Sequence, residues 1–298
     1  MTETSAAGTK LTELVARRGF AVTAEVAPPR GGDPEAALQA ARVAARVADA
    51  INVTDGQGAM LRMSPLAVAR LLREEGIEPV WQLTCRDRNR IALQGELLAA
   101  HALGVRNALI VTGDHMVLGD HPDAKAVFDL DSVQLLHIAR GLNRGEDMTG
   151  AALETPTDLC LGAVVAPEAD NVEVQLLKLR KKVDAGAQFA QTQAVFDPPR
   201  FERFMTHAGA LGVPVLAGLI PVKSPRMARF MNARIPGVNV PPWIIQRLNE
   251  ADPGDLRSVA LEIAGQIAAA VAPCCQGLHI MAQGWEDALG EIAAAAGC

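Results

Sequence analysis

The stretch Phe20-Ala-Val-Thr-Ala-Glu-Val-Ala-Pro-Pro-Arg30 decides the fold. Its apolar run is typical of a buried strand, and the strand must end at the Pro-Pro pair because proline cannot donate to a sheet. Glu25 interrupts this run near its end. Since a carboxylate is costly to bury unless it is paired, Glu25 is either satisfied by a neighbouring backbone or arginine group or used in function.

The same pattern of a short apolar strand followed by a helical stretch repeats along the chain. We predict strands at 20–25, 49–54, 79–85, 107–112, 159–165, 189–193, 213–219 and 276–281. We predict helices at 34–48, 64–75, 88–104, 131–143, 171–186, 198–210, 224–233, 254–271 and 283–296. Continuously apolar strands that alternate with helices indicate a parallel sheet, and eight such units predict a closed (β/α)8 TIM barrel. The alternative, an open doubly wound sheet, is disfavoured because no GxGxxG follows the first strand.

Composition narrows the class of protein. Hydrophobic residues make up 49% of the 298 residues, the net charge is −6, and there is no Gly/Ser linker. We therefore expect one domain over 1–298, with a flexible N-terminus over 1–14. Without a basic stripe, an apolar leader or a membrane-length apolar run, we expect a cytoplasmic protein that binds neither nucleic acid nor membrane.

Function in such a barrel belongs at the carboxyl ends of the strands. Polar residues follow nearly every predicted strand, and capping or turn formation explains only some of them. In chain order they are Glu25, Thr54-Asp55-Gly56, Gln82 with Thr84, Thr112-Gly113-Asp114-His115, Pro167-Glu168 and Gln191-Thr192-Gln193.

At these positions the chain resembles the methylenetetrahydrofolate reductase family. The matching motifs run in register through the chain: Ala24-Glu-Val-Ala-Pro-Pro-Arg30, Ile51-Asn-Val-Thr-Asp-Gly56, Leu83-Thr-Cys-Arg-Asp-Arg-Asn-Arg90, Gly104-Val-Arg-Asn-Ala-Leu-Ile-Val-Thr-Gly-Asp114, Lys181-Lys-Val-Asp-Ala-Gly-Ala-Gln-Phe-Ala-Gln-Thr-Gln193 and Gly218-Leu-Ile-Pro-Val222. The resemblance implies an eight-stranded barrel. It also implies reduction of 5,10-methylenetetrahydrofolate to 5-methyltetrahydrofolate by hydride from a reduced flavin that NAD(P)H supplies.

The resemblance also implies roles for individual residues. Glu25 matches the proton donor that opens the five-membered ring of the substrate, a step that requires a general acid kept protonated by an apolar setting. Asp114 matches a catalytic residue close to flavin and folate, and Gln193 matches a substrate-binding amide. The implied cofactor-binding positions are Thr54, Asp55, Gln82, Thr112, Gly113, Asp114, His115, Ala166, Lys181 and Lys182.

Four of the positions that contact flavin in the well-studied bacterial enzymes differ here. Gln82, Thr112, Ala166 and Gln175 stand where those enzymes have His, Arg, Tyr and Asp. The motifs Arg86-Asp-Arg-Asn-Arg90, Gly113-Asp-His115 and Gln276-Gly-Leu-His-Ile-Met281 look more like the short reductases of acetogen-type one-carbon metabolism. That likeness implies FAD, with FMN as an alternative, and a partner subunit or homo-oligomer.

Three hypotheses follow. The first is the flavin-dependent reductase, the second an enzyme of the same fold that passes hydride directly from NADH to folate, and the third a partner-dependent folate-binding subunit. The cluster Cys274-Cys275 with His279 lacks zinc-site spacing, so we predict no metal site, and we interpret His279 as a satisfied core histidine near the barrel mouth.

Overall fold

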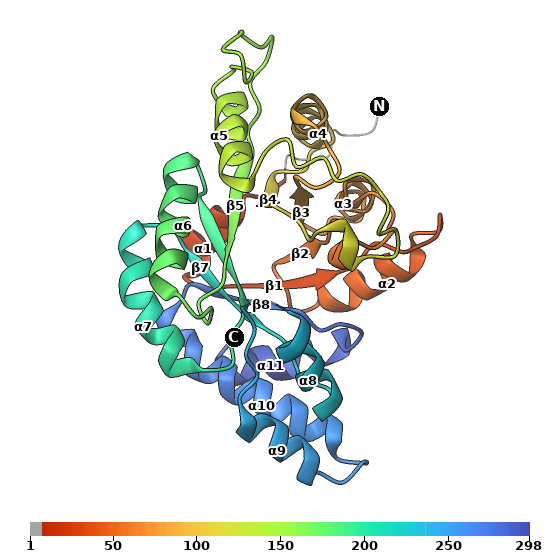
Figure 1. Ribbon diagram of the computed structural model, residues 1–298, viewed down its shortest axis with the longest axis vertical. Helices are drawn as coiled ribbons and strands as arrows, with labels where there is room; N and C mark the ends of the chain where they lie inside the picture. Colours follow the sequence, from red (N-terminus) through yellow and green to blue (C-terminus); the bar gives the residue numbers. More distant parts are fainter. Residues whose placement is uncertain (1–7, 236) are drawn as a thin grey trace.

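The computed structural model describes residues 8–235 and 237–298. Eight parallel strands form a closed barrel in sequence order, and β1 pairs with β8 to complete it (Figure 1). The strands are β1 (Ala21–Val26), β2 (Ala50–Val53), β3 (Pro79–Thr84), β4 (Asn107–Val111), β5 (Cys160–Val165), β6 (Phe189–Ala194), β7 (Val215–Leu219) and β8 (Gly277–Ile280). The predicted (β/α)8 barrel is therefore confirmed, and the open-sheet alternative is excluded.

Helices follow the strands and cover the outside of the barrel (Figure 1). They are α1 (Leu11–Arg18), α2 (Glu35–Ala44), α3 (Pro65–Glu74), α4 (Arg90–Ala102), α5 (Ser132–Asn143), α6 (Val172–Ala185), α7 (Pro198–Ala208), α8 (Pro225–Arg234), α9 (Pro242–Glu250), α10 (Leu256–Val271) and α11 (Leu289–Ala295). Short 3-10 turns are η1 (Gln57–Ala59), η2 (Met116–Leu118), η3 (Gly209–Leu211), η4 (Ala272–Cys274) and η5 (Glu286–Ala288). Helices α1 and α9 were not predicted.

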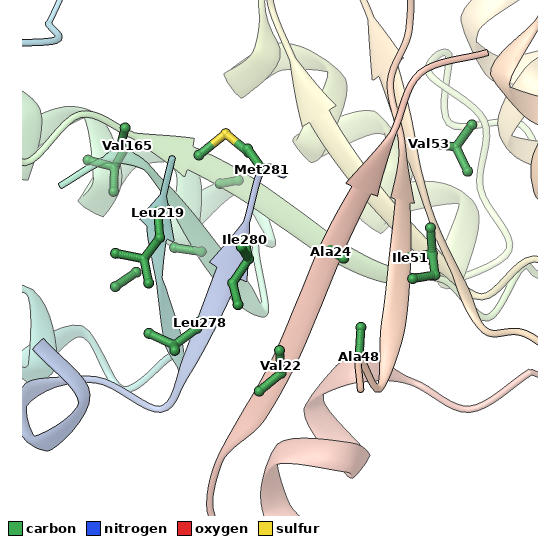
Figure 2. Close-up of a cluster of buried hydrophobic side chains, with 14 of the residues drawn as sticks. Val22, Ala24, Ala48, Ile51, Val53, Val165, Leu219, Leu278, Ile280 and Met281 are labelled. Carbon is green, nitrogen blue, oxygen red and sulfur yellow. The ribbon is translucent and has the colours of Figure 1, made fainter. Parts of the chain in front are cut away.

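Alternation along each strand divides the buried side chains into two layers. Outward-facing residues pack against the helices, and Figure 2 shows Val22 and Ala24 of β1 with Leu278 and Ile280 of β8 in that layer. Inward-facing strand residues form a separate inner cluster with two residues of α1, Leu11 and Val15. The strand residues are Ala21, Ala50, Val80, Leu109, Cys160, Phe189 and Leu216. The barrel is therefore packed with apolar side chains at its amino-terminal end, which leaves the other end for polar groups.

Helix α1 closes the amino-terminal end of the barrel. Leu11 and Val15, one helical turn apart, are buried in the inner cluster. The Asn107 side chain accepts a hydrogen bond from Leu11 N at 2.6 Å. This differs from the expected flexible segment over 1–14: residues 1–7 lie outside the described residues, but from Leu11 onward the chain is helical because apolar burial fixes it.

A glycine lets a large ring fill the same interior. Gly162 of β5 is the register partner of Phe189 of β6, and a Cβ on Gly162 would lie 2.2 Å from Phe189 Cζ. The fully buried Phe189 ring occupies the space that any larger side chain at position 162 would need.

Candidate active site at the barrel mouth

Glu25 lies near the end of β1 with its side chain 12% exposed. Gln82 of β3 donates from Nε2 to Glu25 Oε2 at 3.3 Å, and His279 Nε2 of β8 lies 3.6 Å from the same oxygen. The structure therefore brings the predicted site residues Glu25 and Gln82 together. It also corrects the expected apolar setting, because the groups that contact this carboxylate are an amide and an imidazole.

Beneath Glu25, a buried polar layer crosses the barrel interior. Asn52 Nδ2 donates to Gln191 Oε1 at 2.6 Å, and Gln191 Nε2 donates to Asn52 Oδ1 at 3.1 Å and to Thr23 Oγ1 at 3.2 Å. Thr23 Oγ1 in turn lies 3.0 Å from His279 Nδ1. Each of these buried groups has a partner, as burial requires, and the layer links β1, β2, β6 and β8.

Sequence reasoning missed most of this polar layer. Asn52 and Thr23 were read only as parts of strands, and His279 only as a satisfied core residue. Polar residues two apart on one strand carried the signal, as at Thr23 and Glu25 or Gln191 and Gln193, because residues two apart face the same side of a sheet.

Asp55, after β2, is committed to contacts within the protein. Its Oδ2 accepts from Thr84 N and Thr84 Oγ1, both at 2.9 Å, and from Arg88 Nη1 at 2.7 Å. Burial alone would lower the pKa of the Arg88 guanidinium, but the hydrogen bond and charge of Asp55 raise that pKa above its ordinary value. Asp55 therefore ties the loop after β2 to β3 and the loop that follows it.

Thr54 differs from its neighbour. Its hydroxyl is buried, yet it has no hydrogen-bond partner in the described part of the chain. A buried polar atom without a partner is uncommon in folded proteins, and it suits a position that a ligand completes.

The loop after β4 carries Thr112, Gly113, Asp114 and His115. Asp114 is exposed, and its Oδ2 accepts from Gly58 N in η1 at 2.9 Å. The Thr112 hydroxyl donates to Ser132 Oγ at 3.2 Å. Asp114 therefore joins two loops at the mouth, and its second carboxylate oxygen makes no hydrogen bond within residues 8–235 and 237–298.

The other two residues of this loop shape it. Gly113 has φ 94°, and a Cβ there would lie 3.1 Å from both Thr84 Cβ and Arg86 Cβ. His115 Nδ1 accepts from Val117 N at 3.3 Å and its ring stacks on Phe128 at 6.1 Å between centroids. His115 is thus a cap of η2 that remains exposed.

Lys182 of α6 points to the carboxyl end of β5, where its Nζ donates to Val164 O at 2.6 Å. Burial, with the neighbouring Lys178, lowers the pKa of this ammonium to about 8. No carboxylate forms an ion pair with it among the described residues, whereas Lys181 is exposed on the helix surface. A half-buried cation without an anionic partner is suited to holding a phosphate.

Ala166 and Gln193 complete the predicted set. A Cβ built on Gly237 would lie 3.2 Å from Ala166 Cβ, so backbone of the segment after α8 occupies the space beside this small side chain. Gln193 is half-buried near the end of β6, where the pairing with β7 is irregular. Its amide makes no hydrogen bond to the residues that the structure describes, which leaves both its donor and its acceptor for a ligand.

Glu168, also after a strand, has a different role. It is buried and accepts from Phe196 N at 2.8 Å and Asp197 N at 2.6 Å, while burial raises its pKa. It joins the loops after β5 and β6.

Within the described residues no group of three or more His, Cys, Asp or Glu side chains could hold a metal ion. None of the described helices combines the length and hydropathy that crossing a membrane requires.

Comparisons with known proteins identify the family of this chain. The family model described as methylenetetrahydrofolate reductase matches residues 10–297. The 5,10-methylenetetrahydrofolate reductase of Pectobacterium carotovorum is 29% identical over 251 residues, which cover 82% of this chain and 78% of that protein. The Salmonella typhimurium protein of the same name is 28% identical over 228 residues, or 75% of this chain and 71% of that one.

Two further similarities concern length and fold. Methylenetetrahydrofolate reductase 2 of Schizosaccharomyces pombe is 27% identical over 71% of this chain, which corresponds to 34% of that longer protein. A crystal structure of 2,3-dimethylmalate lyase superposes with a TM-score of 0.51 over 96% of this chain and 83% of that one; at 13% identity it shows the fold alone. Because the family model spans nearly the whole sequence, the chain belongs to the methylenetetrahydrofolate reductase family.

Proposed function

We propose that this chain reduces 5,10-methylenetetrahydrofolate to 5-methyltetrahydrofolate with Glu25 as the general acid and FAD, reduced by NADH, as the hydride donor. The observation that supports it most strongly is the position of the Glu25 carboxyl group inside the barrel mouth, where it contacts the amide of Gln82 and the imidazole of His279. Ring opening needs one proton on the leaving nitrogen, and in this proposal Glu25 supplies it.

The remaining residues bind and orient the substrate. The free amide of Gln193 offers a donor and an acceptor to the edge of a pterin ring, and Asp114 offers carboxylate oxygens to pterin amino groups. The negative charge of Asp114 would also disfavour an anionic reduced flavin and so favour hydride departure.

Two features fit a nucleotide cofactor. The buried Thr54 hydroxyl lacks a partner, and the Lys182 ammonium lacks an anion, so these residues would contact the ring system and a phosphate respectively. When bound, flavin would supply hydride to the opened substrate; FMN is the alternative cofactor of the same chemistry. In this proposal Asp55, Gly113 and His115 support the cofactor through the loops that they shape.

Direct transfer from NADH is a second candidate, and specific contacts favour it. Gln82 already donates to Glu25, Thr112 donates to Ser132, and Ala166 presents no aromatic ring. Three positions that contact flavin in the well-studied bacterial enzymes are thus either engaged within the protein or too small. Calorimetric titration of dialysed protein with FAD, FMN and NADH separates the candidates: NADH binding without flavin would favour direct transfer, and stoichiometric FAD that survives dialysis would exclude it.

The variant Glu25→Gln tests the proposed general acid. An amide can still accept from Gln82 Nε2, so we expect normal folding and cofactor binding, but a loss of about 10²–10⁴ in methylenetetrahydrofolate reduction. Oxidation of NADH with an artificial acceptor should persist, since it needs no folate ring opening. The control is Glu202→Gln, an exposed glutamate on α7. Reduction at the parent rate by Glu25→Gln would refute the assignment, and no reduction by the unaltered chain alone would favour a partner-dependent subunit.

A further inference from the structure

His279 contacts Glu25, the proposed general acid, and the proposed function gives His279 no role. It is paired in register with Thr23 of β1, and Glu25 lies two residues further along the same face of that strand. The imidazole therefore spans both residues, with Nδ1 3.0 Å from Thr23 Oγ1 and Nε2 3.6 Å from Glu25 Oε2. At 4% exposure, solvent contributes little to the state of this ring.

Hydrogen counting in the polar layer decides which ring nitrogen carries the proton. Asn52 Nδ2 donates to Gln191 Oε1, so the other end of that amide, Nε2, is the end that donates to Thr23 Oγ1. The hydroxyl has one proton, and at 3.3 Å it donates that proton to the carbonyl of Leu278, which can only accept. Toward its other two neighbours, Gln191 Nε2 and His279 Nδ1, Thr23 Oγ1 can therefore only accept a hydrogen bond.

His279 must then donate from Nδ1 to Thr23. In the neutral ring this leaves Nε2 without hydrogen, and its lone pair faces Glu25 Oε2. A carboxylate facing a bare nitrogen at this distance is repelled. The carboxylic acid form relieves the repulsion, either with its proton between Oε2 and Nε2 or with an uncharged Oε2 and the proton on Oε1.

We propose that His279 is a positioning residue, neutral and protonated on Nδ1, whose bare Nε2 keeps Glu25 in its acid form and holds Oε2 inward. The inference rests on the proposed role of Glu25. In the reaction, the Oε1–H bond breaks, an N–H bond forms on the leaving nitrogen, and the electron pair of the breaking ring C–N bond goes to that nitrogen. Glu25 is left as a carboxylate, which His279 disfavours, and it takes a proton from solvent at the barrel mouth before the next turnover.

Among the described residues, the side chains around Glu25 and His279 are neutral. Those that contact the pair are Thr23 of β1 and Gln82 of β3, both neutral, and Leu278 O of β8 accepts from Thr23. The next shell, Gln191 of β6 and Asn52 of β2, is neutral as well. Glu25 and His279 are therefore the two titratable groups of this interior layer.

The first test is spectroscopic and needs no substrate. Long-range ¹H–¹⁵N spectra of the uniformly labelled chain, assigned with His279→Asn, should show His279 as the neutral Nδ1–H tautomer from pH 6 to 8. A neutral Nε2–H tautomer or an imidazolium in that range would overturn the proposal. Because this measurement does not use folate, it decides the proposal even if the chain proves not to reduce methylenetetrahydrofolate.

The second test is kinetic. The amide of His279→Gln extends about as far as Nε2 and can donate to Glu25 and stabilise the carboxylate, so the falling limb of the kcat/KM pH profile should move to lower pH by about one unit, which is about tenfold in rate on that limb. Thr23→Val removes the acceptor that fixes the tautomer and should move the limb in the same direction, whereas Thr23→Ser should restore it. A uniform loss of activity at every pH, with an unmoved limb in both variants, would indicate a merely structural role and overturn the proposal.

Discussion

Lys182 provides a test that links folding to cofactor binding. Its ammonium is held at the end of β5 by one hydrogen bond, and its pKa is lowered from 10.5 to about 8 by burial and by Lys178. The interval between those values corresponds to roughly 3 kcal/mol of lost folding stability while the group is charged. Replacing Lys182 with methionine keeps an unbranched stem but sacrifices the bond to Val164 O, worth about 1 kcal/mol. We therefore expect Lys182→Met to be more stable than the parent by about 2 kcal/mol at pH 7.

The pH dependence of that difference has a definite sign. Below pH 8 the lysine is charged in both the folded and unfolded chains, so the full cost of burying it is present. Between pH 8 and 10.5 only the unfolded chain holds the proton, so the stability of the parent rises with pH and the difference between the two proteins shrinks. Urea denaturation of both proteins at several pH values from 7 to 10.5 measures this trend, with the exposed Lys181→Met as the control.

The same substitution should weaken ligand binding. If Lys182 holds a phosphate, losing its charge-assisted hydrogen bond costs about 1.5–3 kcal/mol, or roughly 10- to 100-fold in the Kd for FAD or NADH measured by calorimetry. A variant that is both less stable than the parent at pH 7 and unchanged in cofactor affinity would refute the reasoning. Lys182 would then serve only to hold α6 against β5 through its hydrogen bond to Val164 O.

Two further substitutions separate structural from functional carboxylates at the mouth. Asp55→Asn should leave the half-buried Arg88 without its charged partner and destabilise the fold by about 1.5–3 kcal/mol, seen as an equal fall in the thermal unfolding temperature with and without ligand; a selective loss of cofactor affinity at unchanged stability would contradict this. Asp114→Asn keeps an oxygen for Gly58 N, so we expect a normal fold and cofactor retention but slower folate turnover; an unfolded product would show that the contact to η1 was the main role of Asp114.

The order of the elements was predictable because it depends on local apolar pattern. All eight predicted strands exist within one or two residues of their predicted ends, and closure followed from counting them. Helix α1 was missed because its short apolar spacing, Leu11, Leu14 and Val15, was read as part of a polar terminus. Helix α9 was missed because it begins directly at a proline pair, Pro241-Pro242, that favours a loop in sequence but tolerates a first helical turn.

The candidate site was predictable as a set of positions but not as a set of contacts. Strand ends identify Glu25, Asp55, Asp114 and Gln193, because in a parallel barrel they share one edge. No sequence pattern states that Asp55 turns to Arg88 whereas the Gln193 amide is left without a partner in the described chain. Such choices depend on side-chain geometry between strands that are far apart in sequence.

The two layers of the barrel interior explain why an acid can work at its mouth. The apolar inner cluster, closed by α1, excludes water from below, and the polar layer above it consists of neutral groups whose hydrogen bonds satisfy one another. A neutral, saturated layer offers no salt bridge that would fix Glu25 as a carboxylate. The layer orients His279 through Thr23, so that the imidazole, together with the amide of Gln82, contacts the Glu25 carboxyl group. Substitutions in that layer should therefore change the pH dependence of the reaction, and each one that leaves a buried partner unsatisfied should also cost about 1–3 kcal/mol of folding stability.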